Sequence, residues 1–488
     1  MSPVLTREEA VAFGQRLLGK LSARANGVFL EQNVQAMTKV ANGRILSATD
    51  GDSLSVRIDT RFGRGYGFVL GTNQRNDQLL DRFIAQAHTL ELPKPPDAYP
   101  DDPDDPLHQR YVAQPVPEGA LWYPATVDAM QGARADTAHR VVKQLVASKM
   151  TGAATVGVSA RATLYIYREG LTAYARETDA ELTVTARSTN DPASGWAGQA
   201  RRDWTQMTPD VVTATAIDVA TRSRNTVAFE PGRYTTILGP AAVAQLMRAM
   251  AQLFSAEEAA LGRGPFAAAR ASNKRSRIGE RVIDSRLSMY SDPDDPMGGY
   301  PAFIQEGGGY YGLPTYATQF IRNGVLVNLS EYGLVRGKPK SCSELPYSAH
   351  VTSNMPAVSI EEMIAGCPLG IYVNRFSNVS LVERDSALMT GVTRDGSFLI
   401  RHGKIDRPIK NFRFLDSPMF ALNKVEAIGT PVRAAFGYSP PTGNELLWIV
   451  KSASWPPIHR SQQWPYAPMV VPPLMIKEFN FNSLADSM

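Results

Sequence analysis

The spacing of hydrophobic residues changes several times along the chain, and each change predicts a different element. Apolar residues recur at helical spacing over 11–21, directly after a Thr6–Glu9 segment that fits a capping box. Over 27–70 the pattern alternates with a period of two, and Asn42-Gly43 and Asp50-Gly51 supply turn residues. We therefore predict a helix followed by a meander of antiparallel strands.

Both patterns return after a segment that is rich in proline and aspartate. Helical spacing over 79–90 completes the first unit, and residues 92–120 are predicted to be a linker because their composition cannot build a core. A second unit then follows, with a helix that Thr126 is expected to cap, strands within 153–188 and a helix over 209–222.

Beyond Glu230 the pattern becomes β-rich and is punctuated by glycine. Gly239-Pro240 ends a short apolar strand and begins a helix, since proline suits the first helical position. The stretch 388–414 predicts two strands closed by tight turns at Asp395-Gly396 and His402-Gly403.

Together these elements predict an α+β protein of more than one domain. A chain of 488 residues exceeds what one hydrophobic core usually covers. We expect an N-terminal α+β domain at 1–91, the linker at 92–120, a central α/β domain at 121–229 and a β-rich C-terminal domain at 230–488.

Composition narrows the functional classes. The net charge of +4 is small for this length and the basic residues are scattered, so no nucleic-acid partner is predicted. No apolar run is long enough for a membrane helix, and the N-terminus does not resemble a signal peptide. Two widely spaced cysteines, Cys342 and Cys367, suit a reducing compartment. We predict a soluble cytoplasmic protein.

Local motifs predict no active site. The six histidines are too far apart in sequence for two of them to share one helix face, which a zincin-type metal site needs. CxxC pairs, the GxSxG nucleophile elbow and the phosphate-binding GxxxxGK[ST] loop are also missing from the sequence.

Several segments, in the right order, resemble the TldD/PmbA family, whose PmbA branch is also called TldE. The matching segments are 50–57, 230–244, 277–282, 323–328, 359–364, 370–373, 391–396 and 402–408. The resemblance implies a two-part architecture, with an α/β N-terminal half and a β-rich C-terminal domain, and it implies pairing into dimers.

In the TldD branch, the resemblance implies an HExxxH helix whose histidines bind zinc together with a C-terminal cysteine. Counting back from 277–279, Ser255 and Ala260 occupy the histidine positions and Ala256 the glutamate position, while 438–471 contains no cysteine. The adjacent Glu257 and Glu258 would point about 100° apart on a helix, which favours a solvated face. No catalytic residue and no metal ligand is therefore expected in this chain, and whether it is an enzyme is left open.

The resemblance thus implies a non-catalytic TldE/PmbA-like subunit of a TldD/TldE-type zinc metallopeptidase that acts on unfolded or extended peptides. Its partner would be a TldD-like subunit, which alone would hold zinc, or a second copy in a homodimer. The candidates for lining the peptide channel are Gly308, Tyr310, Trp455, His459 and Trp464.

Two alternatives stay open. One is a peptidase with a relocated site, built from His350, His402 or His459 with carboxylates distant in sequence. The other is a stand-alone, homodimeric modulator that binds peptides.

Overall fold

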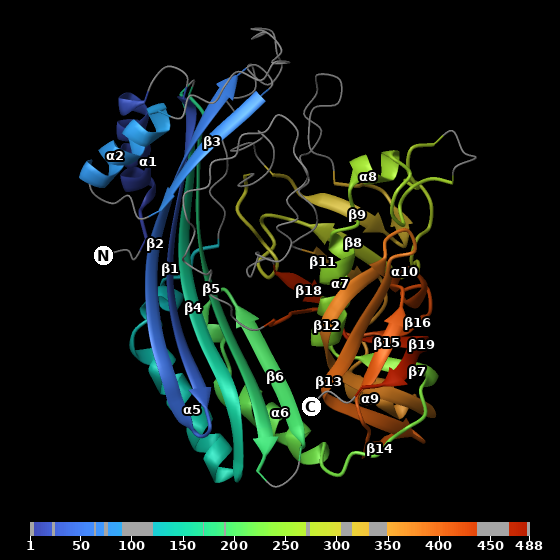
Figure 1. The fold of residues 1–488 in the computed structure, drawn as a ribbon. Coiled ribbons are helices and arrows are strands. Elements are labelled where there is room, and N and C mark those ends of the chain that lie inside the picture. The colour runs from blue at the N-terminus through green and yellow to red at the C-terminus, as the bar shows by residue number, and fades with distance from the viewer. Residues whose placement is uncertain are drawn as a thin grey trace.

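The protein is an α+β molecule with a long antiparallel sheet in its N-terminal half and a β-rich C-terminal half (Figure 1). This confirms the predicted fold class. The computed structural model describes residues 4–21, 25–62, 65–72, 77–89, 121–168, 170–189, 192–269, 274–303, 315–330, 349–436 and 468–485. The predicted linker at 92–120 lies outside these residues. Within the described ranges, no helix is long and apolar enough to cross a membrane.

The N-terminal half is built on one six-stranded sheet of order β3-β2-β1-β4-β5-β6, which we call the central sheet. Its strands are β1 (Ala25–Ala41), β2 (Arg44–Phe62), β3 (Gly65–Thr72), β4 (Met150–Tyr167), β5 (Thr172–Ser188) and β6 (Ser194–Arg201). All neighbours are antiparallel, and β1 pairs with β4 from Gly27↔Tyr167 to Ala41↔Ala153. The boundary predicted between domains 1–91 and 121–229 therefore runs through one sheet. The two helix-and-strand units, which look separate in sequence, pair along β1 and β4 because neither can bury its edge alone.

Helices cover one face of the central sheet. They are α1 (Arg7–Lys20), α2 (Asp77–Thr89), α4 (Pro124–Asp128), α5 (Gly132–Ala147) and α6 (Pro209–Arg222), with a short 3₁₀ turn, η1 (Trp204–Gln206). The capping box of α1 is confirmed, with Thr6 and Glu9 each bonded to the other's backbone. Thr126, in contrast, does not cap a helix. It lies inside α4, and its hydroxyl donates to the carbonyl of Arg202 at 2.7 Å.

The turn predicted at Asn42-Gly43 is confirmed, whereas Asp50-Gly51 and Asp395-Gly396 do not form turns between strands. Asn42-Gly43 does join β1 to β2, with φ values of 50° and 71°. Asp50-Gly51 instead lies within β2, where it pairs with β1 as ordinary strand. Asp395-Gly396 lies within β13 (Leu388–Arg401) as a bulge, with φ values of 51° and 125°. An Asp-Gly pair supplies positive φ at a bulge as readily as at a turn, and sequence alone does not separate the two.

Five strands of the C-terminal half form a closed ring of pairings. They are β7 (Gly232–Leu238), β12 (Leu369–Glu383), β13, β15 (Phe412–Asp416) and β19 (Leu474–Leu484). The ring closes where β12 pairs with β13, and β14 (Lys404–Pro408) and β16 (Val425–Ile428) extend it. His402-Gly403 forms the predicted turn between β13 and β14. Buried phenylalanines pack against one another in the core beside the ring, with Phe376 and Phe414 centred 4.5 Å apart.

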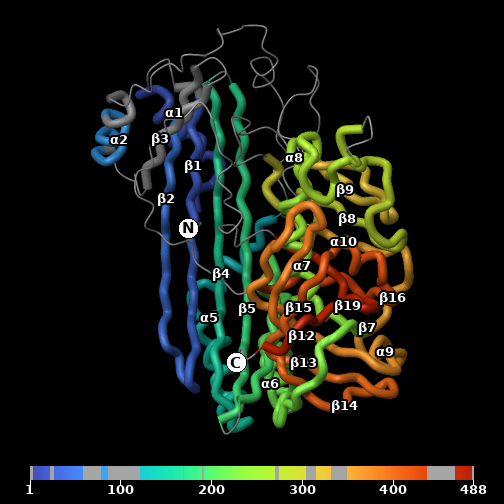
Figure 2. The backbone as a smooth tube through the Cα atoms, turned by 45° about the vertical axis from the view of Figure 1, so that its right-hand side comes forward, coloured from blue at the N-terminus to red at the C-terminus, as the bar shows by residue number. Residues whose placement is uncertain are grey.

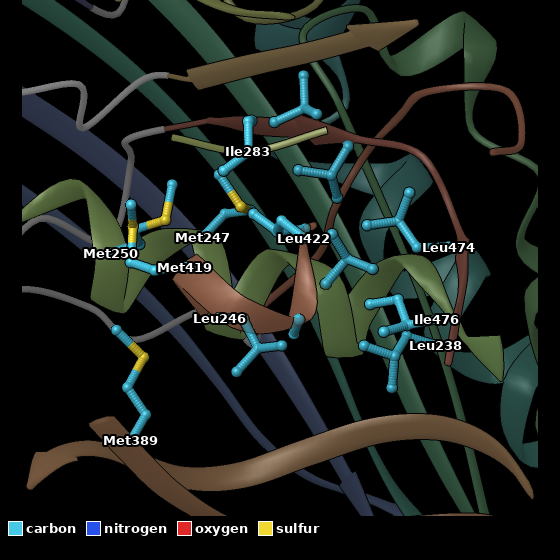
Figure 3. Packing of buried hydrophobic residues seen from close by; sticks show 14 of the residues in the cluster. Leu238, Leu246, Met247, Met250, Ile283, Met389, Met419, Leu422, Leu474 and Ile476 are labelled. Atoms are coloured by element: carbon cyan, nitrogen blue, oxygen red, sulfur yellow. The ribbon is translucent and has the colours of Figure 1, made fainter. Parts of the chain in front are cut away.

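A second sheet lies beside this ring, and helix α7 packs in the core that both share. The sheet has the order β10-β9-β8-β11-β18-β17. Its strands are β8 (Leu287–Ser291), β9 (Thr318–Arg322), β10 (Val325–Leu326), β11 (Ala349–Ser353), β17 (Val432–Arg433) and β18 (Met469–Val471). The helices of this half are α7 (Pro240–Ala251), α8 (Ala256–Ala260), α9 (Ile360–Ala365) and α10 (Pro418–Ala421). Figure 3 shows Leu246, Met247 and Met250 of α7 among the buried side chains of this core.

Candidate functional site

The two faces of the central sheet carry different chemistry. On β4, Val156, Val158 and Ala160 face the helices and belong to apolar clusters with them. Ser159 and Arg161 point to the opposite face, because successive side chains alternate along a strand. We call this the inner face. Neighbouring strands place further buried polar side chains on it: Asn33, Arg57, Glu177 and Thr183. A polar surface that is nevertheless buried is the informative feature here.

An ion network occupies the inner face where the two halves of the molecule meet. Glu177 accepts from Arg161 Nε at 2.7 Å and from Arg202 Nη1 at 3.1 Å. Burial raises the pKa of Glu177, but the charges and hydrogen bonds of the two arginines outweigh it, and the pKa lies below its ordinary value. Arg433 of β17 binds Asp179 of β5, and Arg202 donates to the carbonyl of Gly299. The network therefore ties the central sheet to the C-terminal half.

The bulge in β13 makes a second contact between the halves. It directs the buried carboxylate of Asp395 toward β6, where Ser194 Oγ donates to Asp395 Oδ1 at 2.6 Å. Arg375 Nε donates to Asp395 Oδ2 at 2.8 Å, and Asn374 donates to the carbonyl of Trp196 at 2.8 Å. The feature that looked like a hairpin turn in the sequence thus holds β13 against the edge of the central sheet.

A histidine and a carboxylate distant in sequence form a buried pair in the C-terminal half. His350 Nδ1 lies 2.5 Å from Asp295 Oδ2 and 2.7 Å from the hydroxyl of Tyr290. Asp295 Oδ1 accepts from the backbone N–H groups of Met297 at 2.8 Å and Gly298 at 3.1 Å. Tyr290 and His350 face each other across β8 and β11.

The charges of this cluster follow from its hydrogen bonds. Burial raises the pKa of Asp295, but the hydrogen bonds from His350 and from the two backbone N–H groups prevail and lower it to about 2. Burial and the charge of Asp295 raise the pKa of Tyr290 to about 12. An ionised Asp295 accepts a hydrogen bond from Nδ1 of His350 and so fixes a proton on that nitrogen. Within the described ranges, no hydrogen bond to Nε2 of His350 is found.

A short turn joins the histidine cluster to the ion network. The N–H of Gly299 donates to the carbonyl of Asp295 at 2.7 Å, and the carbonyl of Gly299 accepts from Arg202. A side chain at Gly299 would meet the backbone oxygens of Pro293 and Asp295, so only glycine fits this turn. The inner face and the histidine cluster are therefore parts of one connected polar region.

Comparison with known proteins shows the family of the chain. The family model described as the PmbA/TldA metallopeptidase C-terminal domain matches residues 231–483. The chain belongs to the TldD/PmbA family. No curated protein matches it at a significant level.

Solved structures of TldD/PmbA-type proteins share the fold across the whole chain. TldE from Thermococcus kodakarensis superposes with a TM-score of 0.69 at 13% identity, covering 96% of this chain and 99% of that one. A proposed modulator of DNA gyrase from Bacteroides thetaiotaomicron gives a TM-score of 0.72 at 14% identity, covering 99% and 100%. A protein of the same description from Thermotoga maritima gives 0.69 at 13%, covering 96% and 98%. At such low identity these likenesses show the fold alone.

The residues assigned to the HExxxH positions of the TldD branch lie at helix α8. Ser255 is its N-cap and accepts from the N–H of Glu258 at 3.2 Å, while Ala256 and Ala260 carry no ligand atom. Glu257 is exposed. Glu258 lies within 3.6 Å of Arg263 and 3.4 Å of Arg384. In the part of the chain that the structure describes, no group of three or more His, Cys, Asp or Glu side chains is placed to hold a metal.

The other predicted site residues differ in outcome. The five channel candidates, Gly308, Tyr310, Trp455, His459 and Trp464, lie outside the described residues. His402 is exposed in the β13–β14 turn, whereas His350 does meet a distant carboxylate, Asp295. The inner-face network was not predicted. Its signal was the polar residues at alternate positions, Ser159 and Arg161 on β4 and Glu177 and Asp179 on β5, which were interpreted only as strand-like runs.

Proposed function

We propose that this chain is a non-catalytic, TldE/PmbA-like subunit of a TldD/TldE-type zinc metallopeptidase that handles unfolded or extended peptides. One observation carries the proposal. In this member of the family, the residues at the HExxxH positions, at helix α8, have no zinc-binding side chain. A serine that caps the helix and two alanines cannot bind zinc or activate water. Zinc and the catalytic glutamate would then come from a TldD-like partner. The cysteine usage still favours a reducing compartment such as the cytoplasm.

The inner face supports the peptide part of the proposal. Gln35, Ser55 and Thr185 are half-buried on the inner face and offer hydrogen-bonding groups that suit the N–H and C=O groups of any extended backbone. Such contacts favour an unfolded chain over a folded one without selecting its sequence. In this role the central sheet provides one wall of a chamber, and the partner subunit provides the zinc site.

Co-expression with a TldD-like chain that has an intact HExxxH motif tests the proposal. Native mass spectrometry is expected to show a one-to-one complex with one zinc ion, and the complex is expected to cleave an unfolded protein substrate. A histidine-to-alanine change in the partner's motif should abolish cleavage, while Ser255→Ala in this chain should leave it unchanged. A chain that binds one zinc ion or cleaves peptides by itself would overturn the proposal. A chain that binds peptides only as a homodimer would favour the stand-alone modulator.

The pair formed by His350 and Asp295 favours one second candidate, a hydrolase with a relocated site. An ionised aspartate that orients a histidine through Nδ1 is the arrangement found in general-base catalysis. If this candidate is correct, the purified chain alone should hydrolyse peptides in the presence of a chelator, and His350→Asn should abolish that activity. Absence of chelator-resistant activity would eliminate it.

A further inference from the structure

The last residue of β6, Arg201, is a half-buried arginine at the junction between the two halves of the molecule. Its Nη1 donates to the carbonyl of Ala200, the residue before it, at 2.8 Å. Within the described ranges, no ion pair of Arg201 is found. A guanidinium stays charged at every pH at which a protein is folded. A charge that is partly withdrawn from water without a partner is costly, so its presence favours a ligand of opposite sign.

A second arginine lies close to Arg201 and adds to its charge. It is the buried Arg433, which reaches this junction from the C-terminal half on β17. Ala435, just after β17, packs in one apolar cluster with Trp196 and Ala200 of β6. Burial and the positive charge of Arg433 lower the pKa of Arg201. Figures 1 and 2 both show β5, the neighbour of β6, on the side of the central sheet that faces the C-terminal half.

The nearby carboxylates are already paired with other arginines. Asp179 binds Arg433 and lies 3.9 Å from Nη1 of Arg202. Glu177 is held between Arg161 and Arg202. Nη1 of Arg433 is buried and, among the described residues, has no hydrogen-bond partner. Positive charge is therefore in excess where β6 and β17 meet, and an anion is the missing partner.

A carboxylate is the anion that suits this place in a peptide-handling protein. The planar fork of a guanidinium matches the two oxygens of a carboxylate and binds them through charge-assisted hydrogen bonds. Asp179 and Arg433 belong to the ion network of the inner face. A carboxylate at Arg201 would thus lie beside the surface that we propose contacts the peptide backbone. Peptides supply such a group at their C-terminus and on aspartate and glutamate side chains.

We propose that Arg201, with Arg433 beside it, binds a carboxylate of the peptide. The inference rests on the proposed function for the presence of a peptide, and it adds the chemical group that the junction selects. The backbone contacts of the inner face do not depend on peptide sequence, whereas Arg201 distinguishes a charged peptide group from a neutral one.

Fluorescence anisotropy with the full chain alone tests this site at constant ionic strength. The probes are three labelled extended peptides of one uncharged sequence: one with a free C-terminal carboxylate, one with a C-terminal amide, and one amide with a single internal glutamate. The free-carboxylate probe is expected to bind at least about tenfold more tightly than the neutral amide. Equally tight binding of the glutamate probe would identify side-chain carboxylates as ligands too, whereas weak binding would restrict the site to the peptide end.

Arg201→Gln should bring the free-carboxylate probe to the affinity of the amide. The matched control Arg82→Gln changes an exposed arginine on α2 and should keep the preference. Thermal unfolding without peptide separates a ligand-binding role from a structural one. Because Arg201 is repelled by Arg433, Arg201→Gln is expected to leave the midpoint unchanged or to raise it.

The outcomes separate this inference from the proposed function. Equal affinity for all three probes would overturn the carboxylate site and leave peptide binding intact. If none of the probes bound, both the carboxylate site and the peptide part of the proposed function would fail. A preference for carboxylate that survives in Arg201→Gln, or a lower unfolding midpoint of that variant, would also overturn the assignment to Arg201.

Discussion

The two faces of the central sheet are both buried, yet they are buried in opposite ways. The helix-facing side is apolar and packs against α1, α5 and α6. The inner side carries Arg161, Glu177 and Arg202, which are buried only because their charges are paired. Paired charges are weak evidence for stability, since apolar residues in their place are often as stabilising. The difference indicates that apolar packing specifies the helix-facing side, whereas paired charges join the inner side to the C-terminal half.

The largest expected effect comes from breaking the inner-face network. Glu177→Leu leaves Arg161 and Arg202 buried without their shared carboxylate and should lower the free energy of unfolding by about 4 kcal/mol. Because the pKa of Glu177 is lowered, its contribution is present above its ordinary pKa and is lost as pH falls through the folded value. Urea unfolding at pH 7 and at pH 3 should therefore show a smaller loss in acid. Glu177→Gln serves as a control of the same shape, and an equal loss at both pH values would contradict the ion-pair explanation.

A cavity on the helix-facing side is expected to have a slightly smaller effect. Leu182 is on the same strand, β5, and is fully buried against the helices. Leu182→Ala should cost about 3 kcal/mol through lost burial and an unfilled cavity. The same urea titrations should show that this loss does not change between pH 7 and pH 3. As a control, Val146→Ala truncates an exposed apolar side chain on α5 and should change stability little. A stability loss in Leu182→Ala that depended on pH would contradict the proposed difference between the two faces.

Asp295 extends the test to the histidine cluster. Its pKa of about 2 lies below the ordinary value of 3.8, so its stabilisation is complete above about pH 4 and fades as pH falls toward 2. Asp295→Asn should remove about 2 kcal/mol at pH 7 and much less at pH 2. Acid titration followed by tryptophan fluorescence measures this directly. If the free energy of unfolding fell equally for the variant and the unchanged protein between pH 7 and pH 2, these hydrogen bonds would not stabilise ionised Asp295.

The smallest effect is expected where the bulge contacts β6. Ser194→Ala removes one donor to the buried carboxylate of Asp395 and should cost about 1 kcal/mol. Thr215→Ala removes an exposed hydroxyl that bonds within α6 and is the matched control, with little change expected. Thermal unfolding of both variants compares them. Equal midpoints would mean that Arg375 and Arg394 satisfy Asp395 without Ser194.

The sequence predicts local elements better than it predicts their assembly. The helix 7–20, the Asn42-Gly43 turn and the helix that begins at Pro240 follow from capping, turn chemistry and periodicity, which depend on neighbouring residues. The pairing of β1 with β4 joins residues more than a hundred positions apart, and no local pattern encodes it. The predicted division into two N-terminal domains missed it for that reason.

The candidate site was harder to predict than the fold. The α8 positions could be located by counting from a family segment, but Glu177, Arg202 and Asp295 matter only through partners that folding brings together. Alternation on β4 shows which residues share a face, although it does not show that both faces become buried. The acidic residues at alternate positions of β5, Glu177, Asp179 and Glu181, would have been the signal to follow.

The place of β19 in its ring also sets an order of events during synthesis. Residues 474–484 lie between β7 and β15, so Gly232 finds its partner Phe481 only after the intervening chain has left the ribosome. Until then, β7 and β15 each expose an unpaired side, while the central sheet, complete at Arg201, can already have formed. Nascent chains of this protein should therefore be most vulnerable to proteases and most dependent on chaperones in the interval between these two stages.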